Sequence, residues 1–189
     1  MSLIFNAQNH EYKLDNIKLP SVTQVLQGAG LSDFSKVNPE LLKRAQSFGT
    51  AAHLACQLYD ENRLDIKSLD IALEPRLEAW ILFKRDFGIK TFKEIEKQVY
   101  SIKYQYAGCL DRLLEDALIE IKTCTTIPKT TGLQLSGYQG AYEEMYKVKI
   151  KRRICVQLLD GTYKVEEYKE KSDRTVFLSC LNLYNWGKR

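Results

Sequence analysis

The fold is decided by residues 91–123, which read TFKEIEKQVYSIKYQYAGCLDRLLEDALIEIKT. This stretch alternates between apolar and polar positions and is rich in aromatic and β-branched residues, a pattern typical of strands. It predicts three strands, near residues 92–102, 105–114 and 117–123. We expect these strands to form the sheet at the centre of the fold.

Helical patterns precede the three strands. Ser21 is a candidate N-cap for a short helix, and Pro39 stands where the first turn of a second helix begins. Residues 73–87 carry apolar side chains at helical spacing and predict a third helix. The first 20 residues alternate loosely, which predicts a short hairpin.

Further elements follow the strands. Residues 131–146 predict a helix, and an Asp-Gly turn at residues 160–161 predicts a hairpin between two more strands. Ser172 is expected to cap a last helix. The order is therefore helices, three strands, helix, two strands, helix. This order predicts a mixed α/β (α+β) fold with a single mixed β-sheet flanked by helices.

The composition limits the class of protein. Of the 189 residues, 44% are hydrophobic and 28% charged, which suits one domain over residues 1–189. We expect a helical part over about residues 1–90 and the sheet over about residues 91–189. No apolar run reaches the roughly 18 residues of a membrane span, and no secretory signal is visible. A cytoplasmic protein with no membrane partner is expected, and its net charge of +4 allows an anionic partner without requiring one.

Five cysteines are scattered along the chain without a CxxC pair, at Cys56, Cys109, Cys124, Cys155 and Cys180. This spacing predicts neither a zinc site nor an iron–sulfur cluster. Without a secretory signal the thiols are expected to be reduced, and most of them to be small core residues.

One charged pair stands in a strongly apolar strand. Because strand side chains alternate between faces, Glu120 and Lys122 share one face, whereas Ile119 and Ile121 share the other. Such a pair can combine a carboxylate ligand for Mg²⁺ with a lysine that acts on a metal-bound water. The alternative is a charged pair on the solvent face of an edge strand.

A second carboxylate is expected beside this pair. If residues 105–114 and 117–123 form a hairpin, Asp111 can lie near Glu120 across the ladder. Two adjacent carboxylates repel each other unless a cation lies between them, and a divalent metal would meet that need. Gly108 would permit a close approach or a bulge beside the site.

Three other residues could join this chemistry. His53 follows a small-residue stretch that would let its helix approach the sheet and aim the imidazole at a metal, although a lone histidine is more often a packing or surface residue. Gln134 and Tyr138 share a helix face, where Gln134 could bind a phosphate or a catalytic group and Tyr138 could stack on a base. The alternative is a core tyrosine with a surface glutamine.

Taken in order, these motifs resemble the series found in RecB-type PD-(D/E)XK nucleases, whose core is a restriction-endonuclease-like αβββαβ arrangement. The matching positions are Gly49-x-x-x-His53, Glu96, Gly108-x-x-Asp111, Glu120-x-Lys122 and Gln134-x-x-x-Tyr138. In addition, residues 19–26, LPSVTQVL, are similar to the segment before the nuclease motifs in phage exonucleases and mitochondrial genome maintenance exonucleases.

The resemblance implies a metal site and a catalytic set. The metal ligands would be His53, Asp111, Glu120 and the backbone carbonyl of Ile121, and the cofactor would be Mg²⁺ or Mn²⁺. Asp111, Glu120 and Lys122 would be the catalytic residues, with Lys122 as the catalytic lysine.

The resemblance also implies supporting residues. Gln134 and Tyr138 would position DNA and the lysine, and Glu96 would be a further site carboxylate, with Glu94 on the same strand face by alternation. Some nucleases of the superfamily hold an iron–sulfur cluster with a C-terminal cysteine group. Here only Cys180 follows Cys155, so no cluster is expected.

A basic run of five cations lies within residues 147–153. Its residues Lys149, Lys151 and Arg152 could follow the phosphates of DNA. The alternative, a solvated strand edge protected by charge, explains the run equally well.

The leading hypothesis is a metal-dependent DNA nuclease. We expect an exonuclease that acts on single-stranded or end-exposed DNA in phage or bacterial replication, recombination or repair, alongside proteins of those processes. A structure-selective or nicking endonuclease is the alternative within the enzyme class. A nucleic-acid-binding module on a degenerate nuclease fold is the alternative from another class, and the intact Asp111, Glu120 and Lys122 argue against it.

Overall fold

The computed structural model describes residues 2–6, 9–31 and 37–188. In chain order its elements are β1 (Leu3–Asn6), β2 (Glu11–Leu14), β3 (Ile17–Leu19), α1 (Val22–Gly28), α2 (Pro39–Asp60), the short 3₁₀ helix η1 (Ile66–Ser68), α3 (Glu74–Asp86), β4 (Glu94–Ser101), β5 (Tyr106–Leu113), β6 (Ala117–Lys122), α4 (Thr131–Tyr146), β7 (Arg152–Leu158), β8 (Tyr163–Glu167) and α5 (Asp173–Trp186). The three central strands and the helices and strands predicted around them are confirmed.

A five-stranded mixed sheet forms the centre of the molecule, in the order β4-β5-β6-β7-β8. Strands β4, β5 and β6 are antiparallel neighbours, β6 and β7 are parallel, and β7 and β8 are antiparallel. The parallel pair arises because α4 carries the chain back to the starting edge of β6 before β7 begins. The predicted mixed sheet flanked by helices is therefore confirmed, with the expected αβββαβ order from α3 to β7.

The N-terminal segment differs from the prediction. It forms a separate three-stranded antiparallel sheet, β1-β2-β3, and not a two-stranded hairpin, so the described residues form two sheets where a single one was predicted. The reason is a two-residue turn at Asp15 and Asn16, both with positive φ, which returns the chain into a third strand. The apolar side of this sheet packs on Ala107 of β5 through Tyr12 and Leu19.

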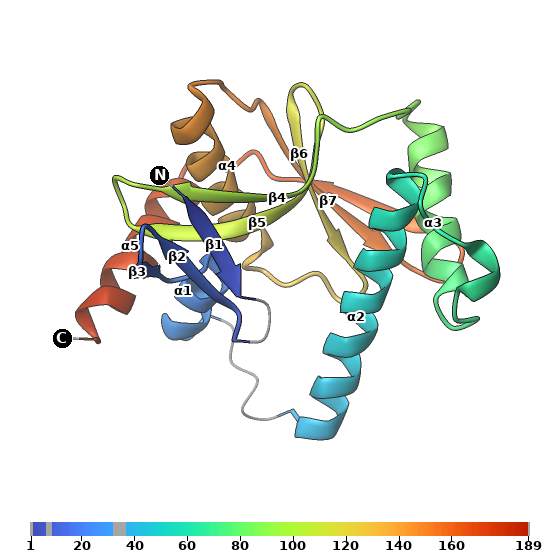
Figure 1. The fold of residues 1–189 in the computed structure, drawn as a ribbon, viewed down its shortest axis with the longest axis horizontal. Helices are drawn as coiled ribbons and strands as arrows, with labels where there is room; N and C mark the ends of the chain where they lie inside the picture. Colours follow the sequence, from blue (N-terminus) through green and yellow to red (C-terminus); the bar gives the residue numbers. More distant parts are fainter. Residues whose placement is uncertain (1, 7–8, 32–36, 189) are drawn as a thin grey trace.

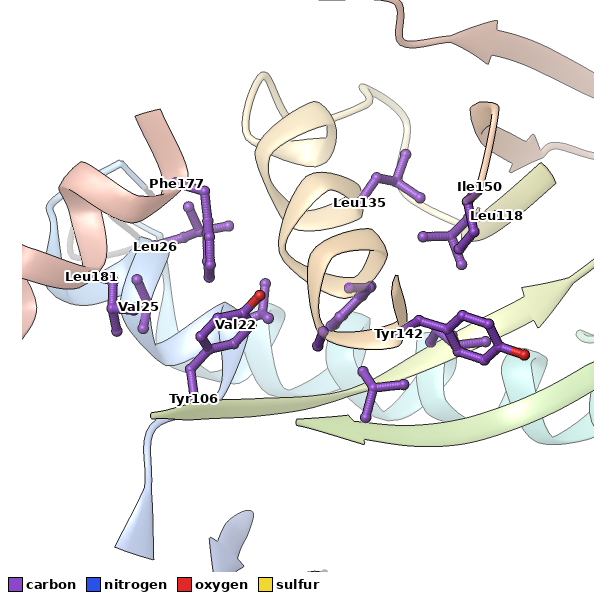
Figure 2. Packing of buried hydrophobic residues seen from close by; sticks show 14 of the residues in the cluster. Val22, Val25, Leu26, Tyr106, Leu118, Leu135, Tyr142, Ile150, Phe177 and Leu181 are labelled. Atoms are coloured by element: carbon purple, nitrogen blue, oxygen red, sulfur yellow. The ribbon is translucent and has the colours of Figure 1, made fainter. Parts of the chain in front are cut away.

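Helices cover both faces of the central sheet (Figure 1). Helices α2 and α3 cover one face, where Trp80 and Phe83 pack on Ile119 and Ile121. Helices α1, α4 and α5 cover the other face, and α4 lies at its centre. Figure 2 shows how α4 is enclosed there by side chains of α1, of α5 and of the sheet, among them Val22, Phe177 and Leu118.

The first residues of three helices test the capping residues that the sequence predicted. Ser21 caps α1 as predicted, because its hydroxyl accepts the N–H of Gln24 while the Gln24 side chain accepts the N–H of Ser21. Asn38 caps α2, with Pro39 at its first turn. The predicted cap at Ser172 is wrong. Its backbone has helical angles, φ −71° and ψ −18°, and its side chain makes no capping bond, since a capping hydroxyl needs an extended backbone.

The burial of the cysteines and the apolar character of the helices test two further expectations from the sequence. All five cysteines are free, and Cys56, Cys155 and Cys180 are buried, so most of them are core residues as predicted. None of the helices in the described part of the chain combines the length and the apolar character that crossing a membrane requires.

The two serine positions provide a matched stability test. We expect Ser21→Ala to lower the free energy of unfolding by about 1 kcal/mol, because it leaves a helix N–H without its partner. Ser172→Ala should change it much less, because no helix N–H loses a partner. Urea unfolding followed by circular dichroism measures both, and equal losses would contradict the assigned cap.

Candidate metal centre

Three carboxylates lie on neighbouring strands of the central sheet. In the β5–β6 register Arg112 faces Ile119, and one step further Asp111 comes opposite Glu120. On the other side of β5, Ile95 of β4 is paired with Arg112 and Lys97 with Leu110, so Glu96 lies opposite Asp111. The predicted proximity of Asp111 and Glu120 therefore follows from the strand register. We refer to Glu96, Asp111 and Glu120 as the carboxylate row.

Helix α2 brings His53 to the carboxylate row. The His53 Nδ1 atom lies 3.5 Å from Asp111 Oδ1, and its Nε2 atom lies 3.1 Å from the carbonyl oxygen of Ile121. The other Asp111 oxygen accepts the Ile121 N–H at 2.7 Å. Helix α2 passes close to the end of β6 here, since a Cβ built on Gly49 would be in ordinary van der Waals contact, 3.5 Å, with Thr123 Oγ1.

Glu96, which the resemblance implied as a further site carboxylate, lies close to His53 and Asp111. Ligand atoms of His53, Glu96 and Asp111 all lie within 4.8 Å of one another. The expectation that Glu94 shares the face of Glu96 is wrong, because Glu96 has a left-handed backbone with φ 46° that interrupts the alternation. Glu94 instead pairs with Lys97 and contacts Tyr142 of α4.

Glu120 is buried, and only one of its two carboxylate oxygens has hydrogen-bond partners among the described residues. Its Oε1 atom accepts hydrogen bonds from Lys122 Nζ and Gln134 Nε2, both at 2.7 Å. Its Oε2 atom is buried and has no hydrogen-bond partner among the described residues. Burial, and then the nearby charge of Asp111, raise the pKa of Glu120 to about 7. An unpartnered carboxylate oxygen in the interior is costly, and a divalent cation would remove that cost.

The donors fit a divalent cation of the Mg²⁺ or Mn²⁺ type. They are carboxylate oxygens, a backbone carbonyl and one imidazole, and hard cations prefer oxygen donors. Neighbouring ligands of an octahedral ion bound at 2.0–2.1 Å lie about 3 Å apart, and the 3.1 Å between His53 Nε2 and the Ile121 carbonyl matches that separation.

Without a cation, His53 balances the charge of Asp111. Burial disfavours the imidazolium, but the charge and hydrogen bond of Asp111 outweigh it and raise the pKa of His53 to about 9. Burial also opposes ionisation of Asp111, yet His53 and the Ile121 N–H lower the pKa of this carboxyl. His53 and Asp111 therefore form an ion pair near neutral pH.

Gln134 and Tyr138 form one network with Lys122. Lys122 Nζ lies 3.0 Å from Gln134 Oε1, and Gln134 Nε2 donates to the Tyr138 hydroxyl at 3.1 Å. The predicted stacking of Tyr138 on a base is wrong, because the ring is 5% exposed and fills the space above Gly108, where a Cβ would lie 2.5 Å from the ring. The alternative of a surface glutamine is wrong too, since Gln134 is buried.

Arg112 belongs to the site although no sequence motif pointed to it. Its fully buried guanidinium donates from Nε to Asp60 and from Nη1 to Glu96, both at 2.7 Å. Asp60, at the end of α2, also accepts hydrogen bonds from Trp80 and Lys84 of α3. The available signal was an arginine inside an apolar strand, where a charge is stable only when it is paired.

The basic run is not brought to the carboxylate row. Arg152 pairs with Glu167 of β8 at 3.2 Å. Lys149 pairs with Glu143 on α4, and Lys151 lies on the side of α4 that faces away from Glu120. None of the three contacts a carboxylate of the row.

Comparisons with known proteins concern the fold. No protein family model and no curated protein sequence matches the chain. The structure is similar to that of a "Putative exonuclease" from Eubacterium rectale, with a TM-score of 0.52 and 10% sequence identity over 74% of this chain and 68% of that chain. A second structure, of the protein SSO0001, has a TM-score of 0.42 and 16% identity over 74% of this chain and 75% of that chain. At 10% identity the first similarity shows a shared fold.

Arg112 provides a stability test. We expect Arg112→Met to lower the free energy of unfolding by about 3 kcal/mol, because Glu96 loses its cation and the buried Asp60 keeps only Lys84. Arg85→Met removes an exposed arginine paired with Asp86 and should stay close to wild type. Urea unfolding compares the two variants, and an equally small loss in both would contradict a structural role for Arg112.

Glu120 provides a pH test in the metal-free protein. Its pKa is raised from 4.5 to about 7 on folding, so the folded state holds the proton more tightly. The stability that this proton contributes is complete below about pH 4.5 and is lost as the pH rises through 7. Glu120→Gln cannot lose a proton, so its stability relative to wild type should rise by about 1–3 kcal/mol between pH 5 and pH 8.

The measurement is thermal or urea unfolding in a chelator at each pH. Glu115→Gln, which changes an exposed carboxylate, is the matched control and should follow wild type. If the free energies of unfolding of Glu120→Gln and wild type differed by the same amount at pH 5 and at pH 8, that result would contradict the raised pKa of Glu120.

Proposed function

We propose that the protein is a metal-dependent nuclease of the RecB-like PD-(D/E)XK type that hydrolyses phosphodiester bonds of single-stranded or end-exposed DNA. The observation that carries the proposal is the grouping of His53, Glu96 and Asp111, whose ligand atoms lie within 4.8 Å of one another. Glu120 lies beside this group on the next strand, paired with Lys122, and one of its buried oxygens has no hydrogen-bond partner among the described residues. The motif order and the fold shared with the Eubacterium rectale protein, which bears an exonuclease name, support it.

Under this proposal the metal would be held by Asp111, Glu120, His53 and the carbonyl of Ile121. Glu96 would add a further carboxylate, which its nearness to His53 and Asp111 supports. A bound Mg²⁺ or Mn²⁺ supplies Lewis acidity to the scissile phosphate and lowers the pKa of water.

Lys122 acts on the phosphate as an ammonium. Burial disfavours its charged form, but Glu120 outweighs burial and raises the pKa of Lys122. Of its three N–H donors, two point to Glu120 and Gln134, so one is available for a phosphate oxygen where negative charge develops. Gln134 is a positioning residue, because its amide holds both Glu120 and Lys122.

The proposal covers the chain as one nuclease domain. The helical part over about residues 1–90 contributes His53, and the sheet and helices over about residues 91–189 contribute the other site residues. Because α2 and the sheet both line the site, neither part is expected to act alone.

Cleavage of end-labelled DNA tests the function. With Mg²⁺ or Mn²⁺ we expect linear single strands to be shortened from an end, while covalently closed circular duplex survives. Lys122→Ala should lower the rate by about 10²–10³-fold, the loss typical of removing one donor to a developing charge. It should retain metal binding measured by calorimetry with Mn²⁺, because Lys122 is not a ligand.

Lys67→Ala, an exposed lysine of η1, is the control and should cleave at the wild-type rate. Rapid nicking of the closed circle would favour the endonuclease alternative. DNA binding without cleavage by any of these metals would favour the binding-module alternative. A Lys122→Ala variant that cleaves like the control would exclude this lysine from the mechanism.

A further inference from the structure

A polar concavity lies on the outer side of α4, between α5 and the β7–β8 hairpin. It consists of two hollows of about 350 Å³ and 620 Å³ that share Gln139 and Arg174 in their linings. We call the two hollows together the α4 groove. The cations that line it come from the basic run, from the β4–β5 turn, from the segment between β8 and α5 and from α5 itself, and they are Lys103, Lys149, Lys151, Arg153, Lys169, Lys171 and Arg174. Arg153 is paired with Asp173.

The α4 groove is separate from the carboxylate row. Gln134 and Tyr138 project from α4 toward the sheet and Glu120. Ser136 and Gln139 line the groove, and Ser136 lies about 200° around the helix from Gln134, since each residue turns it by about 100°. A ligand in the groove and a metal at the carboxylate row therefore occupy different sides of the same helix.

Arg174 is held rigidly at the junction of the two hollows. Its Nη1 atom donates to the Ser136 carbonyl at 3.0 Å and to the Tyr106 hydroxyl at 3.1 Å. The guanidinium lies against Gly140, where a Cβ would come within 1.3 Å of Nη1. The Nε and Nη2 atoms of Arg174 have no hydrogen bond to the described residues, so part of the donor fork remains available. A fixed guanidinium with free donors suits a phosphate group.

The carboxylates of the groove are already engaged by the protein. Glu144 accepts the Ser101 hydroxyl and the N–H groups of Ile102 and Lys103. Glu143 accepts the Ile150 N–H and pairs with Lys149. Of the other two carboxylates that line the groove, Glu167 pairs with Arg152, and Glu170 accepts the N–H and the hydroxyl of Ser172. By contrast, four exposed lysines form no ion pair with any described residue, namely Lys103, Lys151, Lys169 and Lys171. The groove therefore presents unpaired positive charge at several separate points.

We propose that the α4 groove binds the phosphate backbone of single-stranded DNA as a second contact away from the cleavage site. Several cations spread over two joined hollows match repeated phosphates better than one small anion, and such grooves are how proteins follow a single strand. This inference rests on the proposed function only in naming the bound strand as part of the substrate. The second contact keeps a long strand bound between successive cuts.

Strand binding without metal tests the groove directly. The probe is a fluorescein-labelled thirty-nucleotide oligothymidine, followed by anisotropy in a chelator over a range of salt concentrations. Lys169→Ala combined with Lys171→Ala changes two exposed side chains, so folding should be unaffected. We expect the double variant to bind about tenfold more weakly. The slope of log binding constant against log salt concentration should become less steep by about 1.4, since each phosphate contact on a single strand contributes about 0.7.

Two further variants sharpen the test. Lys67→Ala combined with Lys90→Ala removes two exposed lysines elsewhere and should bind like wild type. Arg174→Lys keeps the positive charge but loses the planar set of guanidinium N–H donors, and it should also weaken binding of the oligothymidine. Groove variants that bind like the control pair would overturn the proposal, and so would a loss confined to duplex DNA.

Cleavage separates this inference from the proposed function. The groove variants should cut a short oligonucleotide at the wild-type rate and release a long strand after fewer cuts. Wild-type cleavage combined with unchanged binding in the groove variants would overturn the groove and leave the nuclease proposal intact. Groove-dependent binding by a protein that cleaves with no metal would support the groove and overturn the nuclease proposal.

Discussion

The buried pairing of Arg112 with Asp60 and Glu96 is the interaction on which the rest of the structure depends. It joins the end of α2 to β5 and β4, and Asp60 extends it to α3 through Trp80 and Lys84. A buried charge is tolerated only with its partners, so these elements have to meet at one place. Because Asp60 follows His53 by seven residues, or two helical turns, both side chains leave α2 toward the sheet. The pairing of Arg112 thereby holds His53 over Asp111.

The carboxylate row is balanced by cations from the same strands and from α2. Arg112 pairs with Glu96, His53 lies beside Asp111, and Lys122 pairs with Glu120. Nη2 of Arg112 and the second oxygen of Glu120 are buried without a hydrogen-bond partner among the described residues, and this oxygen leaves negative charge beside the other carboxylates. This remaining negative charge, at a place rich in oxygen donors, is the electrostatic reason to propose a divalent cation.

Helix α4 connects the two proposals. Its inner side holds Lys122 and Glu120 through Gln134, and Gln134 is itself supported by Tyr138 above Gly108. Its outer side supplies the floor of the α4 groove, where Gly140 leaves room for Arg174. Under the two proposals a single helix positions the reacting groups on one side and a length of strand on the other. The basic run is then relevant to binding a strand and not to the cleavage site.

By itself the sequence determined the elements and the local pattern of the site. The three strands, the placement of Glu120 and Lys122 on one face, and the common face of Gln134 and Tyr138 follow from strand and helix periods, which are local properties. The tertiary structure alone decided which of these faces are buried and what they meet. The left-handed backbone at Glu96 redirects its carboxylate, and the packing of α4 on Gly108 buries Tyr138. Arg112 and Asp60 lie 52 positions apart in the chain, and no local period links residues at that separation.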